Sequence, residues 1–111
     1  MPTLASILEH TKIHPSAYLG RGNGDYYARL VGFILGYGFG AKQDGGDSTF
    51  QALQIGFNDY VKTTLNSKHE PPQYSGDDHW TDVILSEAGN DSGAFKLFYE
   101  LWETFAQTQA A

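Results

Sequence analysis

The stretch FKLFYELWETF, residues 95–105, says more about the fold than any other part of this chain. Its large apolar residues recur at spacings of three and four, at Phe95, Phe98, Leu101, Trp102 and Phe105. That period is typical of an α-helix with one apolar face. Lys96 and Glu100 stand four residues apart on the other face, and Asp91 or Ser92 can cap the start. The stretch predicts an amphipathic helix packed against a core.

An earlier segment also predicts an amphipathic helix. It lies between two turn-rich segments at residues 42–47 and 67–76. Ser48 can cap its start, and Gln51 three residues later completes a capping box. Apolar residues then follow at helical spacing, at Phe50, Leu53, Phe57, Tyr60, Val61 and Leu65. We expect this helix to end near Asn66.

Two shorter helices are predicted at other places in the chain. One runs from about Asp78 to Ser86, with Asp77 or Asp78 as its cap, Trp80 in the core and Gly89 at its end. The other is one or two turns near the N-terminus, where Leu4, Ile7 and Leu8 precede His14-Pro15.

Residues 25–40 fit both a helix and a glycine-interrupted strand or hairpin. Small residues recur every fourth position, at Ala28, Gly32, Gly36 and Gly40. On a helix they form a ridge that lets a second backbone approach closely, whereas in a strand the pattern has no use. We therefore favour a helix, although each interior glycine costs about 1 kcal/mol relative to alanine. In this helix Tyr26, Leu30, Phe33 and Tyr37 share one face.

Taken together, these segments predict an all-α fold: a compact single-domain bundle of four to five helices over residues 1–111. A chain of 111 residues is the length of one domain, and its 41% hydrophobic content is that of a globular protein. The sequence contains no cysteine, so disulfides, thiolate metal sites and cysteine nucleophiles are excluded. Its longest apolar run is about half of the roughly twenty residues that a membrane-spanning helix needs. A soluble cytoplasmic protein is the default expectation.

Charge is unevenly distributed along the chain. Residues 1–43 hold four basic and two acidic residues, a net +2, while residues 44–111 hold three basic and eleven acidic ones, a net −8. Nucleic acids and anionic membranes repel such a surface, so we expect neither direct nucleic-acid binding nor membrane binding. The pattern favours a basic protein partner instead.

No motif reaches the level of a catalytic or metal-binding signature. His10 and His14 have a zinc-compatible spacing, but Pro15 disfavours helical geometry at His14. The cluster of Asp77, Asp78 and Asp82 lacks the ligand spacing of a calcium loop, and the glycine run at residues 20–24 lacks a Walker lysine. We predict no catalytic residue, no metal site and no cofactor.

The acidic and aromatic stretch YSGDDHW, residues 74–80, is a plausible recognition edge. Aromatic side chains supply contact area, while acids complement lysine and arginine on a partner. Some of the acids have local duties as helix caps, so the net −8 overstates the charge free for recognition. The predicted partner-binding residues are Asp44, Asp47, Asp59, Tyr74, Asp77, Asp78, His79, Asp82 and Glu87. We expect them to form one face.

Five segments of the chain also resemble a known group of proteins. They are IHPSAYLG at residues 13–20, FILGY at 33–37, GFNDYV at 56–61, HWTDVIL at 79–85 and AFKLFYEL at 94–101. Their order and spacing are similar to those of small acidic bacterial proteins that look like immunity proteins of polymorphic or contact-dependent toxin systems. The resemblance implies a shared helical fold and no catalytic residues.

The leading hypothesis is therefore a cytoplasmic immunity-type protein, not an enzyme. It would bind a cognate basic toxin domain, for example a nuclease, and occlude its active site. The alternative is a small ligand-binding protein or enzyme, with a pocket lined by Tyr18, Tyr26, Tyr37 and His79. A third hypothesis is a homodimer or adaptor that uses the glycine ridge.

Overall fold

The computed structural model describes residues 4–20, 25–41, 51–53 and 55–110, and every regular element in these ranges is helical. The helices are α1 (Leu4–Ile13), α2 (Pro15–Leu19), α3 (Tyr26–Ala41), α5 (Gly56–Asn66), α6 (Trp80–Ala88) and α7 (Asp91–Ala110). Residues 51–53 add a short helical turn before α5. The all-α prediction is confirmed, and the described part of the chain contains no strand.

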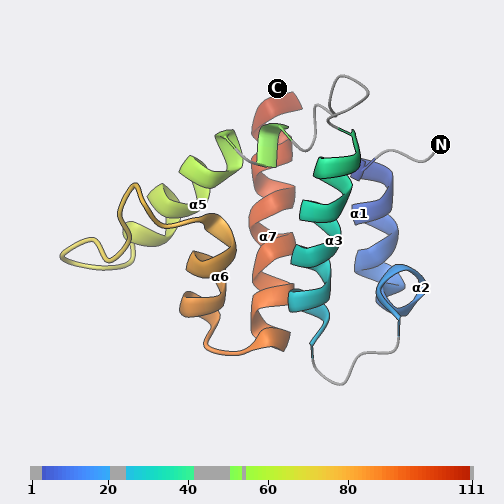
Figure 1. Ribbon diagram of the computed structural model, residues 1–111. Helices are drawn as coiled ribbons and strands as arrows, with labels where there is room; N and C mark the ends of the chain where they lie inside the picture. Colours follow the sequence, from blue (N-terminus) through green and yellow to red (C-terminus); the bar gives the residue numbers. More distant parts are fainter. Residues whose placement is uncertain (1–3, 21–24, 42–50, 54, 111) are drawn as a thin grey trace.

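The longest helix, α7, lies at the centre of the bundle. It packs on α3, α5 and α6, while α6 also packs on α5, and α2 bridges α1 and α3. Figure 1 shows α5 and α6 on one side of α7 and α1 and α3 on the other. The molecule therefore has two flanks that share α7 as their common wall.

Phe57 of α5 is the hub of the core. Its ring is fully buried and meets four aromatic rings edge-on, with centroid distances of 5.3 to 5.7 Å. One ring comes from α6 and three come from α7, and they belong to Trp80, Phe98, Trp102 and Phe105. The expected burial of Trp80 is confirmed. Its Nε1 has no hydrogen-bond partner among the described residues, so packing alone stabilises this ring.

Residues 26–41 form a helix, as favoured, but the predicted packing of its glycine ridge is wrong. Ala28, Gly32 and Gly36 are exposed, and a Cβ added at Gly32 or Gly36 would meet nothing within 4 Å. The buried residues are Tyr27, Leu30 and Ile34, on the opposite side of the helix. Burying these larger apolar side chains removes far more area from water than a close backbone contact would, so it sets the rotation of the helix. The homodimer hypothesis, which uses the exposed ridge, stays a prediction.

The helix ends differ from the expected capping scheme in two places. Helix α6 begins two residues later than expected, and His79 caps it: Nδ1 accepts a hydrogen bond from the Thr81 amide at 3.4 Å. The amide of Gly93 donates to Asn90 Oδ1 at 2.7 Å, so Asn90 caps α7. Gly89 ends α6 in the left-handed conformation with φ 84°, as predicted. Helix α5 ends at Asn66, also as predicted, while the Ser48 cap lies outside the described residues.

Asp91, expected to cap its own helix, instead caps α3. Its Oδ1 accepts a hydrogen bond from the Tyr27 amide at 2.8 Å, and its Oδ2 accepts one from the Ala28 amide at 2.9 Å. Asp91 also lies in the first turn of α7. One carboxylate therefore stands at the N-termini of two helices, where both helix dipoles favour a negative charge.

Replacing Asp91 should destabilise the protein through α3. We expect Asp91→Ala to lower the free energy of unfolding by about 1–2 kcal/mol, because it leaves two amides of α3 without their acceptor. Urea denaturation followed by circular dichroism measures this loss. Ser92→Ala is the matched control, since Ser92 is the exposed neighbour of Asp91 on α7. Equal effects of the two substitutions would show that Asp91 does not cap α3.

Two glycine-to-alanine substitutions should change the stability of the fold in opposite directions. Gly36→Ala should stabilise the fold by about 0.5–1 kcal/mol, because it lowers the entropy of the unfolded chain and its Cβ meets only open space. In Gly56→Ala the new Cβ would lie 3.0 Å from Phe105 Cζ, in the packed core. We expect a loss of about 1 kcal/mol there, since overpacking outweighs the gain in propensity. Thermal melts of both variants decide the signs, and a stabilised Gly56→Ala would contradict the tight packing at Phe105.

Candidate functional site

The loop between α5 and α6, residues 67–79, and the first turns of α6 bring together some of the predicted recognition residues. Tyr74, Asp78 and Asp82 line one shallow depression of about 250 Å³. Its other lining residues are Gln73, Val83 and Ser86. Figure 1 shows this loop at the edge of the molecule, extending away from α7 between α5 and α6. We call this surface the α6 face.

Polar side chains of α5 hold the loop in place. Asn66 Oδ1 accepts hydrogen bonds from the amides of Gln73 and Tyr74 at 3.0 and 2.8 Å, and Asn66 Nδ2 donates to the Tyr74 carbonyl at 2.9 Å. Lys62 Nζ donates to the Gly76 carbonyl at 3.1 Å. The ammonium of Lys62, a side chain that is almost fully buried, is therefore directed at the loop backbone. These four bonds fix where the acids of the loop project.

Asp78 is half-buried and has a local role in the loop. Its Oδ2 accepts a hydrogen bond from the Ser75 amide at 2.8 Å, which closes the turn at residues 75–78. It does not cap α6, contrary to expectation, because His79 occupies that position. Asp82, one turn along α6, is exposed. The two carboxylates share the depression and no described ion pair neutralises either of them.

Glu87, near the end of α6, is engaged inside the molecule. Tyr74 Oη donates to Glu87 Oε2 at 2.8 Å, and His69 Nε2 lies 2.9 and 3.1 Å from the two carboxylate oxygens. Burial alone would raise the pKa of Glu87, but these hydrogen bonds outweigh it and hold the pKa below its usual value. Burial raises the pKa of Tyr74, and Glu87 adds to that shift. Glu87 therefore clamps the loop to α6, and only 18% of its side chain is exposed.

His79 is likewise a structural residue in this arrangement. Its ring lies against Trp80, with centroids 5.6 Å apart, and its Nδ1 is 2.8 Å from Thr81 Oγ1. Burial lowers the pKa of His79, and Lys62 adds to this, while Asp82 opposes it. The neutral ring is the form that can accept the capping hydrogen bond from the Thr81 amide.

The remaining predicted residues are dispersed or lie outside the description. Asp77 is exposed in the loop, and Asp59 is exposed on α5 without a described contact to the depression. Asp44 and Asp47 lie outside the described residues. A residue that we did not predict is Leu85, which is 43% exposed and follows Asp82 by three positions on α6. The i, i+3 spacing from Asp82 was the signal that could have identified it.

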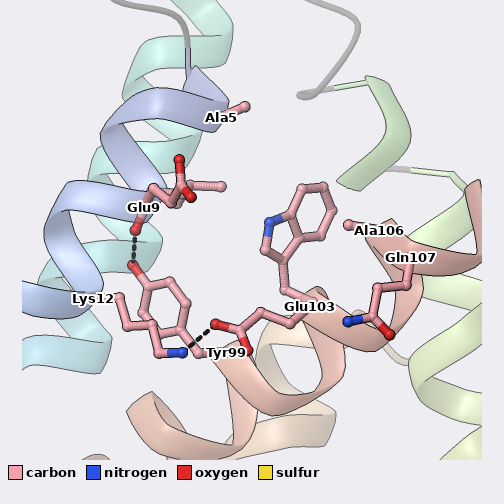
Figure 2. A pocket seen from close by; sticks show the side chains of 9 residues that line it. Ala5, Glu9, Lys12, Tyr99, Glu103, Ala106 and Gln107 are labelled. Atoms are coloured by element: carbon pink, nitrogen blue, oxygen red, sulfur yellow. Dashed lines mark hydrogen bonds and ion pairs between the residues drawn. The ribbon is translucent and has the colours of Figure 1, made fainter. Parts of the chain in front are cut away.

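A second concavity lies on the other flank, between α1 and α7. It has a volume of about 380 Å³, and we call it the α1–α7 groove. Figure 2 shows Glu9 and Lys12 entering it from α1 and Tyr99, Glu103 and Gln107 from α7. Tyr99 Oη donates to the Leu8 carbonyl at 2.8 Å, and Lys12 pairs with Glu103 across one end. Burial raises the pKa of Tyr99, and the nearby Glu103 adds to this shift.

Among the described residues, three side chains named for the aromatic pocket of the alternative hypothesis each pack on a different aromatic neighbour, and that hypothesis stays a prediction. Tyr26 packs on Phe95, Tyr37 packs on Phe33, and His79 packs on Trp80. These neighbours lie at different places in the bundle. The side chain of Tyr18 lies outside the description.

Comparisons with family models, with curated proteins and with solved structures find no match to this chain. The resemblance to immunity proteins therefore stays a prediction. Within the described residues, no group of three or more histidines and carboxylates is arranged to hold a metal ion. No helix in the same part of the chain has the length and apolar character needed to cross a membrane.

The Glu87 clamp should make stability depend on pH. Because the pKa of Glu87 is lower in the folded protein than in the unfolded chain, its contribution is complete above the unfolded value of about 4.3. It is lost as the pH falls through the folded value. We expect Glu87→Gln to lower the free energy of unfolding at pH 7 by about 1–3 kcal/mol and to flatten its decline in acid.

Urea denaturation at a series of pH values measures both effects. Glu100→Gln is the matched control, because Glu100 is exposed and its carboxylate has no described partner. A Glu87→Gln variant with the same acid dependence as the wild type would show that the clamp does not contribute.

Proposed function

We propose that this protein is an immunity-type inhibitor that binds a cognate basic toxin domain, such as a nuclease, through the α6 face. The observation that carries the proposal is the depression in which Tyr74, Asp78 and Asp82 come together, with exposed Asp77 in the loop beside it. In this proposal the protein acts in the cytoplasm by occlusion and performs no chemistry of its own.

The chemistry of the α6 face supports a basic protein partner. Asp77, Asp78 and Asp82 supply three of the negative charges of a chain whose net charge is −6. Such a surface attracts a cationic partner at long range and raises the rate of encounter. Tyr74 lines the depression with Asp78 and Asp82, and Leu85, which is exposed and follows Asp82 by three positions on α6, offers further apolar contact area. Aromatic and aliphatic anchors among complementary charges are typical of protein interfaces.

Its geometry also supports binding without large rearrangement. Asn66, Lys62 and Glu87 hold the loop backbone and the Tyr74 ring before any partner arrives. A surface held in this way loses less conformational entropy on association than a free loop would. Glu87 and His79 then act as supports of the face, and Asp77, Asp78, Asp82, Tyr74 and Leu85 are its contact residues.

The proposal is tested by capture of the partner from cells of the source organism. The tagged chain is incubated with lysate at 50 mM and at 500 mM salt, and retained proteins are identified by mass spectrometry. We expect a basic protein whose association rate falls by about tenfold or more over this range. Expression of that protein alone should arrest growth, and co-expression of this chain should restore it. A neutral or acidic partner, or one with salt-independent association, would contradict the proposal.

Paired charge-neutralising variants locate the interface. Asp77→Asn combined with Asp82→Asn should slow association, because both carboxylates are exposed on the α6 face. Glu9→Gln combined with Glu100→Gln removes the same charge from exposed positions on α1 and α7, outside the α6 face, and should change the rate little. If both pairs of substitutions lowered the association rate equally, net charge and not the α6 face would determine binding.

A further inference from the structure

The α1–α7 groove exists because two helices face each other with small residues at one end. Its α1 wall consists of Ala5, Leu8, Glu9 and Lys12, and its α7 wall consists of Tyr99, Trp102, Glu103, Ala106 and Gln107. On both helices these positions follow spacings of three and four, so each set is one continuous stripe. Figure 2 shows Ala5 and Ala106 on opposite sides of the groove, and the Lys12–Glu103 pair at its other end. Alanine side chains cannot fill the space between the helices, whereas the ion pair closes it.

The base of the groove is apolar and aromatic. Leu8 and Tyr99 are buried, and Trp102 is half-buried. The Tyr99 ring is held in place because its hydroxyl donates to the Leu8 carbonyl. Trp102 is held from behind by Phe57 and Phe105, with ring centroids 5.4 and 5.8 Å away. The groove therefore has a rigid aromatic wall, and its volume of about 380 Å³ is within the range of small-molecule sites.

The rim of the groove carries an excess of negative charge. Lys12 pairs with Glu103, while no ion pair joins Glu9 to another of the described residues. Figure 2 shows the Glu9 side chain between the two helices, above the Tyr99 ring. The faces of Trp102 and Tyr99 are themselves weakly negative because of their π electrons. Both features favour a cation over an anion.

A neighbouring cavity of about 350 Å³ beyond the ion pair provides a contrast. Its charged lining residues are Lys12, Lys96, Glu100 and Glu103, two of each sign. The lining of this cavity is neutral overall, whereas the lining of the α1–α7 groove has a net negative charge because of Glu9. The unpaired negative charge therefore lies at the Glu9 end of the α1–α7 groove.

We propose that the α1–α7 groove binds a small organic cation, with an ammonium or guanidinium head beside Glu9 and an apolar body on Leu8 and Trp102. The head would be attracted by the Glu9 carboxylate, and the body would displace water from the aromatic wall. This inference does not rest on the proposed function, because the groove lies on the α1 flank and the α6 face lies on the other side of α7. A small-molecule site and a protein interface can therefore be tested separately.

Three probes of the same shape test the charge preference on the full chain. They are 2-phenylethylamine, which is cationic at neutral pH, 2-phenylethanol, which is neutral, and phenylacetate, which is anionic. Each is titrated while tryptophan fluorescence is recorded, because Trp102 lines the groove and Trp80 is buried away from solvent. We expect the amine to bind about fivefold more tightly than the alcohol, and the acid to bind most weakly. No binding of the amine, or no preference over the alcohol, would overturn the proposal.

Two variants and a control locate the site. Glu9→Gln should remove the preference for the amine and leave the affinity for the alcohol unchanged. Ala106→Phe should fill the groove and abolish binding of both probes. Glu70→Gln, an exposed carboxylate of the loop at residues 67–79, should change neither affinity. Glu9 is exposed, so its substitution leaves the fold intact and decides the question even if Ala106→Phe unfolds the protein. A Glu9→Gln variant that keeps the amine preference would overturn the proposal.

Discussion

The packing of Phe57 against four aromatic rings is the constraint on which the rest of the structure depends. Phe57 is the point at which α5, α6 and α7 meet, and its ring is fully buried. Edge-to-face aromatic contacts have a preferred geometry, so they set the angle between helices as well as their distance. Through Trp80 they place the start of α6, and through Trp102 and Phe105 they hold the α7 wall of the groove.

Both candidate surfaces follow from this hub. Asn58, the neighbour of Phe57, accepts a hydrogen bond from the Trp80 amide at 2.7 Å, and this bond links α5 to the first turn of α6. Lys62 and Asn66, one and two turns further along α5, hold the loop that carries Tyr74 and Asp78. On the other flank, Trp102 is backed by Phe57 and faces the groove. The α6 face and the α1–α7 groove therefore lie on opposite sides of the same packed aromatic layer.

The helices themselves were largely predictable, because the periodicity of apolar residues is a local property. The apolar stripe at residues 95–105 and the end of α5 at Asn66 were confirmed, and so was the helical conformation of residues 26–41. The rotation of α3 was not predictable, because a ridge of small residues and a row of larger ones compete for the core. Tyr27, Leu30 and Ile34 occupy it, and the ridge is exposed. The groove between α1 and α7 was missed for a related reason, since it depends on which stripes of the two helices face each other.

The sequence by itself determined the all-α class, the burial of Trp80 and the excess of acid after residue 43, because these follow from composition and local spacing. Only the tertiary structure decided what each acid does. Asp91 caps α3 from 64 residues away, and Glu87 bonds to Tyr74 and His69 across the loop. Asp78 and Asp82 meet Tyr74 at one depression. A carboxylate accepts hydrogen bonds from whichever donors the fold brings within about 3 Å. The spacing of residues along the sequence does not show which distant segments the fold brings together.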